Sequence, residues 1–122
     1  KITENEEHIV IFAIDDASAD ANQLMFNIIN YNLDNYSQAE FSTNLQDVDD
    51  QISMISIRGV GKKIETLAYI NKILQDTSVM EVTSGKKIST FTISESNLAV
   101  FSENKSVSVY LKFYEKNYLR SN

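Results

Sequence analysis

Two groups of aspartates have the residue types and spacing in this chain that come closest to a metal-binding or acid–base site. Asp15 and Asp16 follow an apolar run, and Asp47, Asp49 and Asp50 fill a short acidic turn. Paired carboxylates can bind Ca²⁺ or Mg²⁺, or act as general acid and base. The EF-hand spacing is absent, because the sixth position from Asp15 or Asp47 is not Gly and the twelfth is not Glu. We therefore interpret the first group as a helix cap and the second as a solvated turn.

A cationic segment is the second candidate site. Arg58, Lys62 and Lys63 surround Gly59 and Gly61 at a predicted strand-to-helix junction. Free N–H groups at a helix start, together with cations, could hold a phosphate or a carboxylate, so we name these three basic residues as possible anion contacts. The P-loop spacing is not met, because Gly61 follows Gly59 too soon and no Ser or Thr follows Lys62. A flexible connection with solvated lysines is the simpler interpretation.

Catalytic and redox chemistry has few residues available. The chain has no Cys, which excludes disulfides, thiolate zinc sites, iron–sulfur ligation and a Cys nucleophile. It has one histidine, His8, which begins a predicted strand without a clear partner. No G-x-S-x-G or S-x-x-K nucleophile motif stands out. We expect no catalytic residue, no metal site and no cofactor.

Charge is spread unevenly over the 122 residues, whose net charge is −6. Residues 1–50 carry eleven acids and one base, net −10, whereas residues 51–122 carry six acids and ten bases, net +4. Such polarity could steer a partner, but we favour two halves that interleave in one sheet and partly cancel. The acidity argues against nucleic-acid binding. No apolar run approaches the ~20 residues of a membrane span.

Hydrophobic periodicity predicts the elements that must position these residues. Residues 8–14 (HIVIFAI) predict a central strand, because both faces of the run are apolar. Apolar residues at three- and four-residue spacing predict helices over 19–36 and 62–76. Three further strands are predicted from alternation, the first two as a hairpin: 39–45, 52–58 and 88–93.

Each predicted helix has one apolar stripe that should face the core. Gly59 and Gly61 are interpreted as the passage into the second helix, and no definite element is assigned to residues 79–82. The first stripe consists of Leu24, Met25, Ile28, Ile29, Leu33 and Tyr36, and the second of Ile64, Leu67, Ala68, Ile70 or Asn71, and Leu74.

The order of elements is the split βαβ pattern, which predicts a ferredoxin-like fold of the α+β class. We expect a four-stranded antiparallel sheet with order 4-1-3-2, two helices on one face and an extra C-terminal helical segment. Residues 8–122 form this single domain, and residues 1–7 are a polar linker or tail. Strands one and three would then be central, in agreement with their apolar character.

The C-terminal segment 106–118 has two possible interpretations. Alternate apolar residues favour a fifth strand, whereas an aromatic stripe at helical spacing favours a helix, which we prefer. The first strand is apolar on both faces, so something should cover the second face near Val10 or Ile11. This tail helix or a second copy of the sheet could do so, and we predict that the helix packs there. Its possible partner or core contacts are Tyr110, Phe113, Tyr114 and Tyr118.

One spaced pattern near the C-terminus is more specific than the rest. It consists of Ile93-Ser94-Glu95-Ser96-Asn97, then Phe101, Lys105, Tyr110, Phe113 and Asn117-Tyr118. The pattern resembles the C-terminal domain of large tetratricopeptide-repeat proteins of Bacteroidetes, the group associated with gliding motility and type IX secretion. The strand that follows His8, and Leu67-Ala68-Tyr69 in the second helix, add to a resemblance that covers about residues 8–119. The chain departs from the family at Val60, where an aromatic residue is frequent, and it lacks the repeats.

The resemblance implies a periplasmic, outer-membrane-associated module of a larger lipoprotein, without catalysis in this domain. Its protein partners would be other envelope components and upstream repeats, with a homodimer left open. Because the chain opens on Lys1 rather than Met, we expect a processed product or an excised domain.

Our hypothesis is thus a non-enzymatic protein-interaction module that supports an envelope secretion or gliding machine. The alternative is a regulatory domain of the same topology that binds a small molecule, such as an amino acid, near residues 58–63. A third interpretation is a hydrolase or oxygenase that uses His8.

Overall fold

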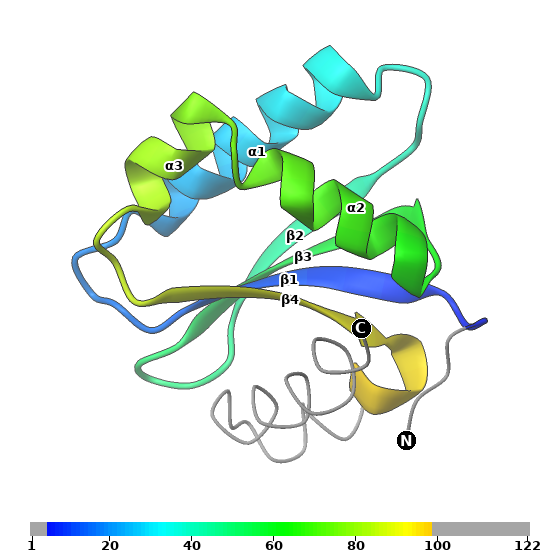
Figure 1. The fold of residues 1–122 in the computed structure, drawn as a ribbon. Helices are drawn as coiled ribbons and strands as arrows, with labels where there is room; N and C mark the ends of the chain where they lie inside the picture. Colours follow the sequence, from blue (N-terminus) through cyan, green and yellow to red (C-terminus); the bar gives the residue numbers. More distant parts are fainter. Residues whose placement is uncertain (1–4, 99–122) are drawn as a thin grey trace.

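Four strands and three helices make up the part of the chain that the computed structural model describes, residues 5–98. The strands form one antiparallel sheet with the order β2-β3-β1-β4 (Figure 1). This order confirms the predicted ferredoxin-like βαββαβ fold of the α+β class. In chain order the elements are β1 (His8–Ile14), α1 (Ala21–Asn35), β2 (Ser42–Asp47), β3 (Ser53–Gly61), α2 (Lys63–Ile73), α3 (Thr77–Thr83) and β4 (Ile88–Ser94).

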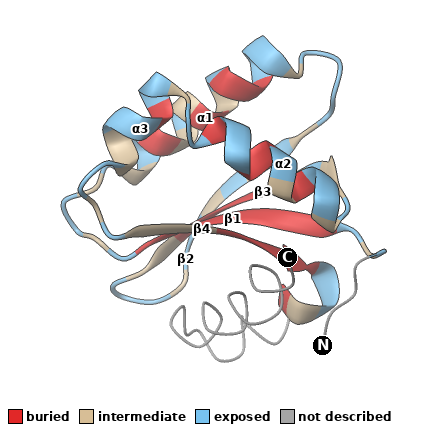
Figure 2. Ribbon diagram, in the orientation of Figure 1, coloured by how far each residue is buried: buried red, intermediate tan, exposed pale blue. Residues whose placement is uncertain are grey.

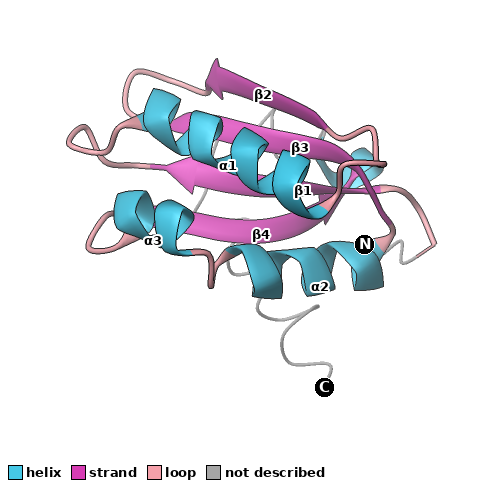
Figure 3. Cartoon of the chain, turned by 90° about the horizontal axis from the view of Figure 1, so that it is seen from above, coloured by secondary structure: helices cyan, strands magenta, loops and turns pink. Residues whose placement is uncertain are grey.

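The helices lie together on one face of the sheet (Figure 1). Seen from above, α1 lies over the middle of the sheet, while α2 and α3 lie along the β4 side (Figure 3). The short helix α3 falls where no definite element was predicted. The carboxylate of Asp76 caps its start by accepting a 3.1 Å hydrogen bond from the amide of Val79, whose side chain is buried.

The larger apolar cluster joins buried residues of the helices to buried residues of the sheet, and the buried parts of both layers are red in Figure 2. Val10, Phe12 and Ile14 supply the β1 share of this cluster. Burial of such side chains contributes about 1.5–3 kcal/mol each, which makes this cluster the main source of stability. The other fully buried members are Leu24, Ile28, Ile55, Ile57, Ile73 and Val79.

The second face of the sheet also buries apolar side chains, as the two apolar faces of β1 predict. Ile9 and Ile11 lie there beside Phe91 of β4, and all three side chains are fully buried. Leu98 joins them from a helical turn over 95–98, directly after β4 (Figure 1). Both faces of β1 therefore belong to apolar clusters.

The C-terminal helix predicted over 106–118 lies wholly outside the described residues. Its aromatic residues Tyr110, Phe113, Tyr114 and Tyr118 lie there as well. That this segment packs on the second face therefore stays a prediction.

The buried stripes of the two long helices differ from those predicted. Leu33 is 62% exposed, and α1 buries Tyr31 and Asn32 in its place. In α2 the prediction was wrong by about one residue of rotation, because Ile64 is 77% exposed and Leu74 is also exposed. Of the predicted stripe, Ile70 is buried as expected. The helix also buries Thr66, Tyr69 and Ile73, and the first two carry hydroxyl groups that apolar periodicity does not count.

The glycine pair lies in β3 rather than in a passage to the helix, which corrects the prediction. β3 extends to Gly61, and the pairing with β1 shifts between His8, which faces Gly61, and Val10, which faces Ile57. Gly59 has a φ of +97°, and a Cβ atom there would lie 2.8 Å from the carbonyl oxygen of Glu40. Only glycine combines this left-handed backbone with so close an approach.

Candidate functional site

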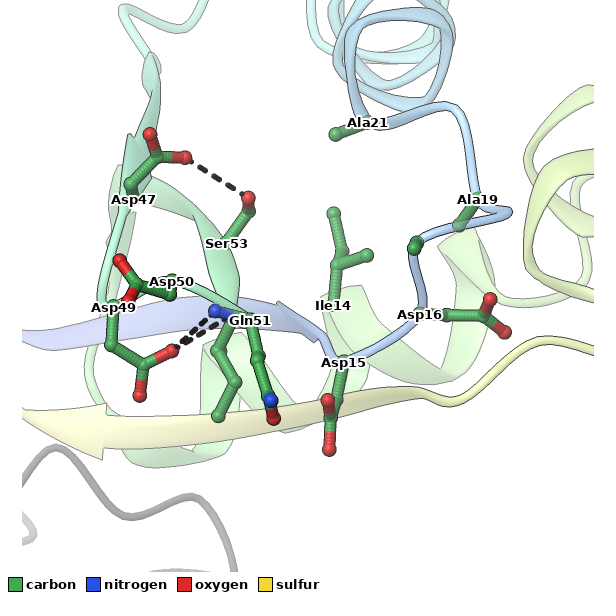
Figure 4. A pocket seen from close by; sticks show the side chains of 12 residues that line it. Ile14, Asp15, Asp16, Ala19, Ala21, Asp47, Asp49, Asp50, Gln51 and Ser53 are labelled. Atoms are coloured by element: carbon green, nitrogen blue, oxygen red, sulfur yellow. Dashed lines mark hydrogen bonds between the residues drawn. The ribbon is translucent and has the colours of Figure 1, made fainter.

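One hollow lies at one end of the sheet and is acidic. It is open, has a volume of about 840 Å³, and lies between the β1–α1 connection and the β2–β3 hairpin (Figure 4). The structure thus brings together the two aspartate groups that are far apart in the sequence. We call it the acidic hollow, and its carboxylates come from Asp15, Asp16, Asp47, Asp49 and Asp50.

Asp16 organises the connection between β1 and α1. One of its oxygens accepts hydrogen bonds from the hydroxyl of Ser18 at 2.6 Å and from the Ser18 amide at 3.0 Å. The other accepts from the amide of Lys87 at 3.0 Å. These bonds, the Ser18 hydroxyl first, lower the pKa of Asp16 to about 2. The helix cap itself is Asp20, which accepts from the amide of Gln23, and this corrects the interpretation of Asp15 and Asp16 as the cap.

The hairpin aspartates form a solvated turn, as predicted. The carboxylate of Asp49 accepts hydrogen bonds from the amides of Gln51 and Ile52 at 2.8 and 2.9 Å (Figure 4). Asp47 accepts from the hydroxyl of Ser53 at 3.2 Å. Asx-type bonds of this kind build tight turns.

Within residues 5–98, no three acidic, His or Cys side chains converge closely enough to hold a metal ion. Asp16, Asp47 and Asp49 accept hydrogen bonds within or beside their own loops, and the five carboxylates together give this end of the sheet a negative surface.

The predicted anion contacts lie at the opposite end of the sheet. Arg58 belongs to β3, and its Nε lies 3.4 Å from a carboxylate oxygen of Glu95. Lys62 and Lys63 stand at the start of α2, where the amide of Lys62 donates a 2.8 Å hydrogen bond to the carboxylate of Glu65. The positions that an external anion would take beside Arg58 and Lys62 are thus partly filled by carboxylates of the chain itself.

His8 begins β1 and is fully buried between its neighbours in the sheet. It pairs with Gly61 on one side and Ser94 on the other, and its side chain has no exposed surface. Its Nδ1 lies 2.9 Å from the carbonyl oxygen of Glu6. A ring so enclosed has no access to a substrate in the folded chain.

A smaller, apolar hollow lies between α1 and the edge strand β2, and the sequence analysis did not identify it. Its volume is about 220 Å³. Ile29 and Leu33 of α1, Tyr36 and Phe41 of the connection, and Thr43 of β2 line it. We call it the α1–β2 hollow.

Aromatic rings that line the α1–β2 hollow pack against one another and against Tyr69. Tyr36 and Phe41 lie with ring centroids 5.1 Å apart, and Phe41 meets Tyr69 edge-on at 5.8 Å. The hydroxyl of Tyr69 donates a 2.6 Å hydrogen bond to Asn32, joining α2 to α1. Burial raises the pKa of Tyr69 above its usual range.

The outer face of α1 leads into this hollow with exposed apolar side chains. Phe26 is 59% exposed and Leu33 is 62% exposed, and they stand seven residues apart on one side of the helix, with Ile29 between them. The sequence analysis assigned Ile29 and Leu33 to the core stripe, so the only available signal was Phe26, an apolar residue at helical spacing from both but outside that stripe.

No helix in the described part of the chain is long and apolar enough to cross a membrane. The chain matches no family model, no curated protein and no solved structure.

Proposed function

We propose that this chain is a non-enzymatic protein-interaction module. One observation carries the proposal, namely the combination of an open sheet edge, exposed apolar side chains on the neighbouring helix and exposed aspartates at the hairpin that ends this edge. β2 is an edge strand, and Phe26 and Leu33 are exposed on the neighbouring helix. Residues 2–57 contain eleven acids and no Lys or Arg. Exposed apolar groups within a polar surround are typical of protein contact sites.

The placement of the reactive residue types supports the non-enzymatic part of the proposal. His8 is buried, and the hydrogen-bonded aspartates of the acidic hollow serve their own turns. General acid–base catalysis needs a titratable group within reach of a bound substrate.

The biological setting of the proposal rests on the sequence resemblance. The pattern from Ile93 to Tyr118 is similar to the C-terminal domain of Bacteroidetes repeat proteins, so the module would support an envelope secretion or gliding machine. It would act on the periplasmic side of the outer membrane as part of a larger protein. The alternative, a regulatory domain that binds a small molecule, is separated from this proposal by experiment.

Site-specific photo-crosslinking of the full chain tests the proposal. A photoreactive residue replaces one exposed side chain at a time, at Leu33, Asp50, Ile64 or Glu81, and each variant is incubated with an envelope extract of the source cells. We expect a discrete crosslinked protein from at least one position. Folded variants that crosslink to nothing from any position would contradict the interaction module. A rise in melting temperature with amino acids alone would then favour the regulatory domain, because a ligand at 100 times its Kd adds ~2.7 kcal/mol.

A further inference from the structure

We propose that the open edge of β2 is the docking site for an extended basic peptide segment of a partner protein. The segment pairs with β2 as a fifth strand. It seats one apolar side chain in the α1–β2 hollow and places one Lys or Arg at the acidic hollow. This inference rests on the proposed interaction function and names the partner's chemistry.

The backbone of β2 is available for pairing on its outer side. In the described sheet β2 pairs with β3 alone, in register from Ser42 opposite Arg58 to Asp47 opposite Ser53. Every second residue of an edge strand points its N–H and C=O groups away from the sheet. β2 (STNLQD) has no Pro and no Lys, two of the devices by which proteins protect an edge strand from pairing.

The two hollows lie along this one edge, in register with the strand. Thr43 lines the α1–β2 hollow, and Asp47 lines the acidic hollow. Residues four apart in a strand point to the same face, and they lie roughly 14 Å apart. A partner strand paired with β2 would therefore present one side chain to each hollow. Those two side chains would stand four residues apart in the partner.

The α1–β2 hollow suits an apolar side chain. Its volume of about 220 Å³ is below the ~300–1,000 Å³ of small-molecule sites, so it fits one side chain better than a whole ligand. Leu33 forms an exposed apolar wall, and the rings of Tyr36 and Phe41 contribute the floor. Burial of an apolar group here would also cover part of Leu33.

Charge determines which partner fits the other end of the edge. Asp47, Asp49 and Asp50 are all exposed at the hairpin, and within residues 5–98 none of them forms a salt bridge with a Lys or Arg. A basic segment would be steered to this end and held in register there. A second copy pairing edge to edge would present only the same β2 and hairpin residues, which include no cation to meet Asp47, Asp49 or Asp50.

The test is a titration of the full chain with a synthetic peptide, followed by NMR amide shifts. The probe is a nine-residue peptide of Thr and Ser with Leu at the third position and Lys at the seventh. The first matched peptide carries Glu at the seventh position in place of Lys. The second carries the Lys at the sixth position, so that its Leu and Lys point to opposite faces of the strand. We expect the probe to shift the amides of β2, with a Kd about tenfold lower than that of either matched peptide.

Two surface substitutions test the protein side. Leu33→Asp places a charge in the apolar wall, and Asp50→Lys reverses a charge at the acidic hollow. Each should weaken the probe about tenfold. The matched controls are Ile64→Asp, at a side chain 77% exposed on α2, and Glu81→Lys on α3, and they should change the Kd less than twofold.

The outcomes separate this inference from the proposed function. Equal binding of all three peptides, unchanged binding after both substitutions, or shifts confined to α2 would overturn the docking site. Crosslinks from Leu33 to a second copy of this chain would overturn the basic peptide as occupant. In these cases a partner crosslinked at another position would leave the interaction module standing. No crosslinked protein at any position would remove the module itself.

Discussion

The sheet ends in two edge strands that differ in what lies beside them. β4 is closed, because its residues from Phe91 to Ser94 are buried and α2 packs along it (Figures 2 and 3). The hydroxyl of Thr66 in α2 lies 2.7 Å from that of Thr92 in β4. β2 is open, with no fully buried residue along its length.

The contrast shows how one small domain can protect one edge and leave the other accessible. A helix laid beside an edge strand removes it as a template for pairing. α1 lies further from its edge and leaves the α1–β2 hollow between itself and β2. The closed edge should therefore govern stability, and the open edge should govern binding.

The largest expected effect comes from the closed edge. Phe91→Ala removes a fully buried ring and should lower the free energy of unfolding by about 3–5 kcal/mol. Leu45→Ala, on partly exposed β2, is the matched change at the open edge and should cost under about 1.5 kcal/mol. Urea denaturation followed by circular dichroism measures both. Equal losses would remove the distinction between the edges.

A smaller effect is expected at the hydrogen bond between Tyr69 and Asn32, which joins α2 to α1 beside the α1–β2 hollow. Tyr69→Phe removes the hydrogen bond to buried Asn32 and should cost about 1–3 kcal/mol. Burial raises the pKa of Tyr69 above its usual range and that of Tyr31 to about 12. Both tyrosines therefore stabilise the fold below pH ~10, and this contribution is lost as the pH rises toward their folded pKa values.

Unfolding between pH 9 and pH 11.5 checks the alkaline part of this prediction. The loss of stability should be shallower in Tyr69→Phe than in the unaltered chain. An identical slope in the two proteins would show that this tyrosine does not couple to alkaline unfolding.

The hydroxyl pair that joins α2 to β4 gives a third, smaller effect. Thr66 also donates to the carbonyl of Lys63, so Thr92 serves as the donor between the two hydroxyls. Thr66→Val should cost about 1–2 kcal/mol, because Thr92 loses this acceptor in a buried position. The Thr66→Val and Thr92→Val double variant should cost less than the sum of the single variants, measured as a double-mutant cycle. Strict additivity would mean that the pair does not hold the edge.

The smallest effect concerns the acidic hollow. The depressed pKa of Asp16 gives stability that is present above its ordinary value of 3.8 and is lost as the pH falls toward about 2. Asp16→Asn should flatten this decline between pH 4.5 and pH 2, followed as melting temperature. Ser18→Ala removes only the hydroxyl bond and should flatten it in part. A decline as steep in Asp16→Asn as in the unaltered chain would assign acid sensitivity to other groups.

The sequence predicted the fold well because its apolar patterns are strong and local. β1 was predicted with its observed bounds, and β4 to within one residue, from runs that are apolar or alternate. β2 begins three residues later than predicted, since a turn holds the amide of Ala39 to the carbonyl of Tyr36. The stripe of α2 was misassigned because Thr66 and Tyr69 bury hydroxyls whose partners come from β4 and α1.

The candidate sites were predicted less completely. The sequence identified the hairpin aspartates as a turn and took Asp15 and Asp16 for a helix cap, and the meeting of the two groups around one hollow depends on strand order. The α1–β2 hollow was missed because Leu33 has the spacing of a core residue, yet it lies beside an edge with nothing packed on it.

The sequence by itself determined the order of elements, the central position of β1 and the division of charge between the two halves. These follow from local periodicity and composition, which each segment carries alone. Only the tertiary structure decided which edge is closed and which is open. That choice depends on where α1 and α2 come to rest on the sheet, and on hydrogen bonds such as Thr66 to Thr92 that join residues distant in the chain.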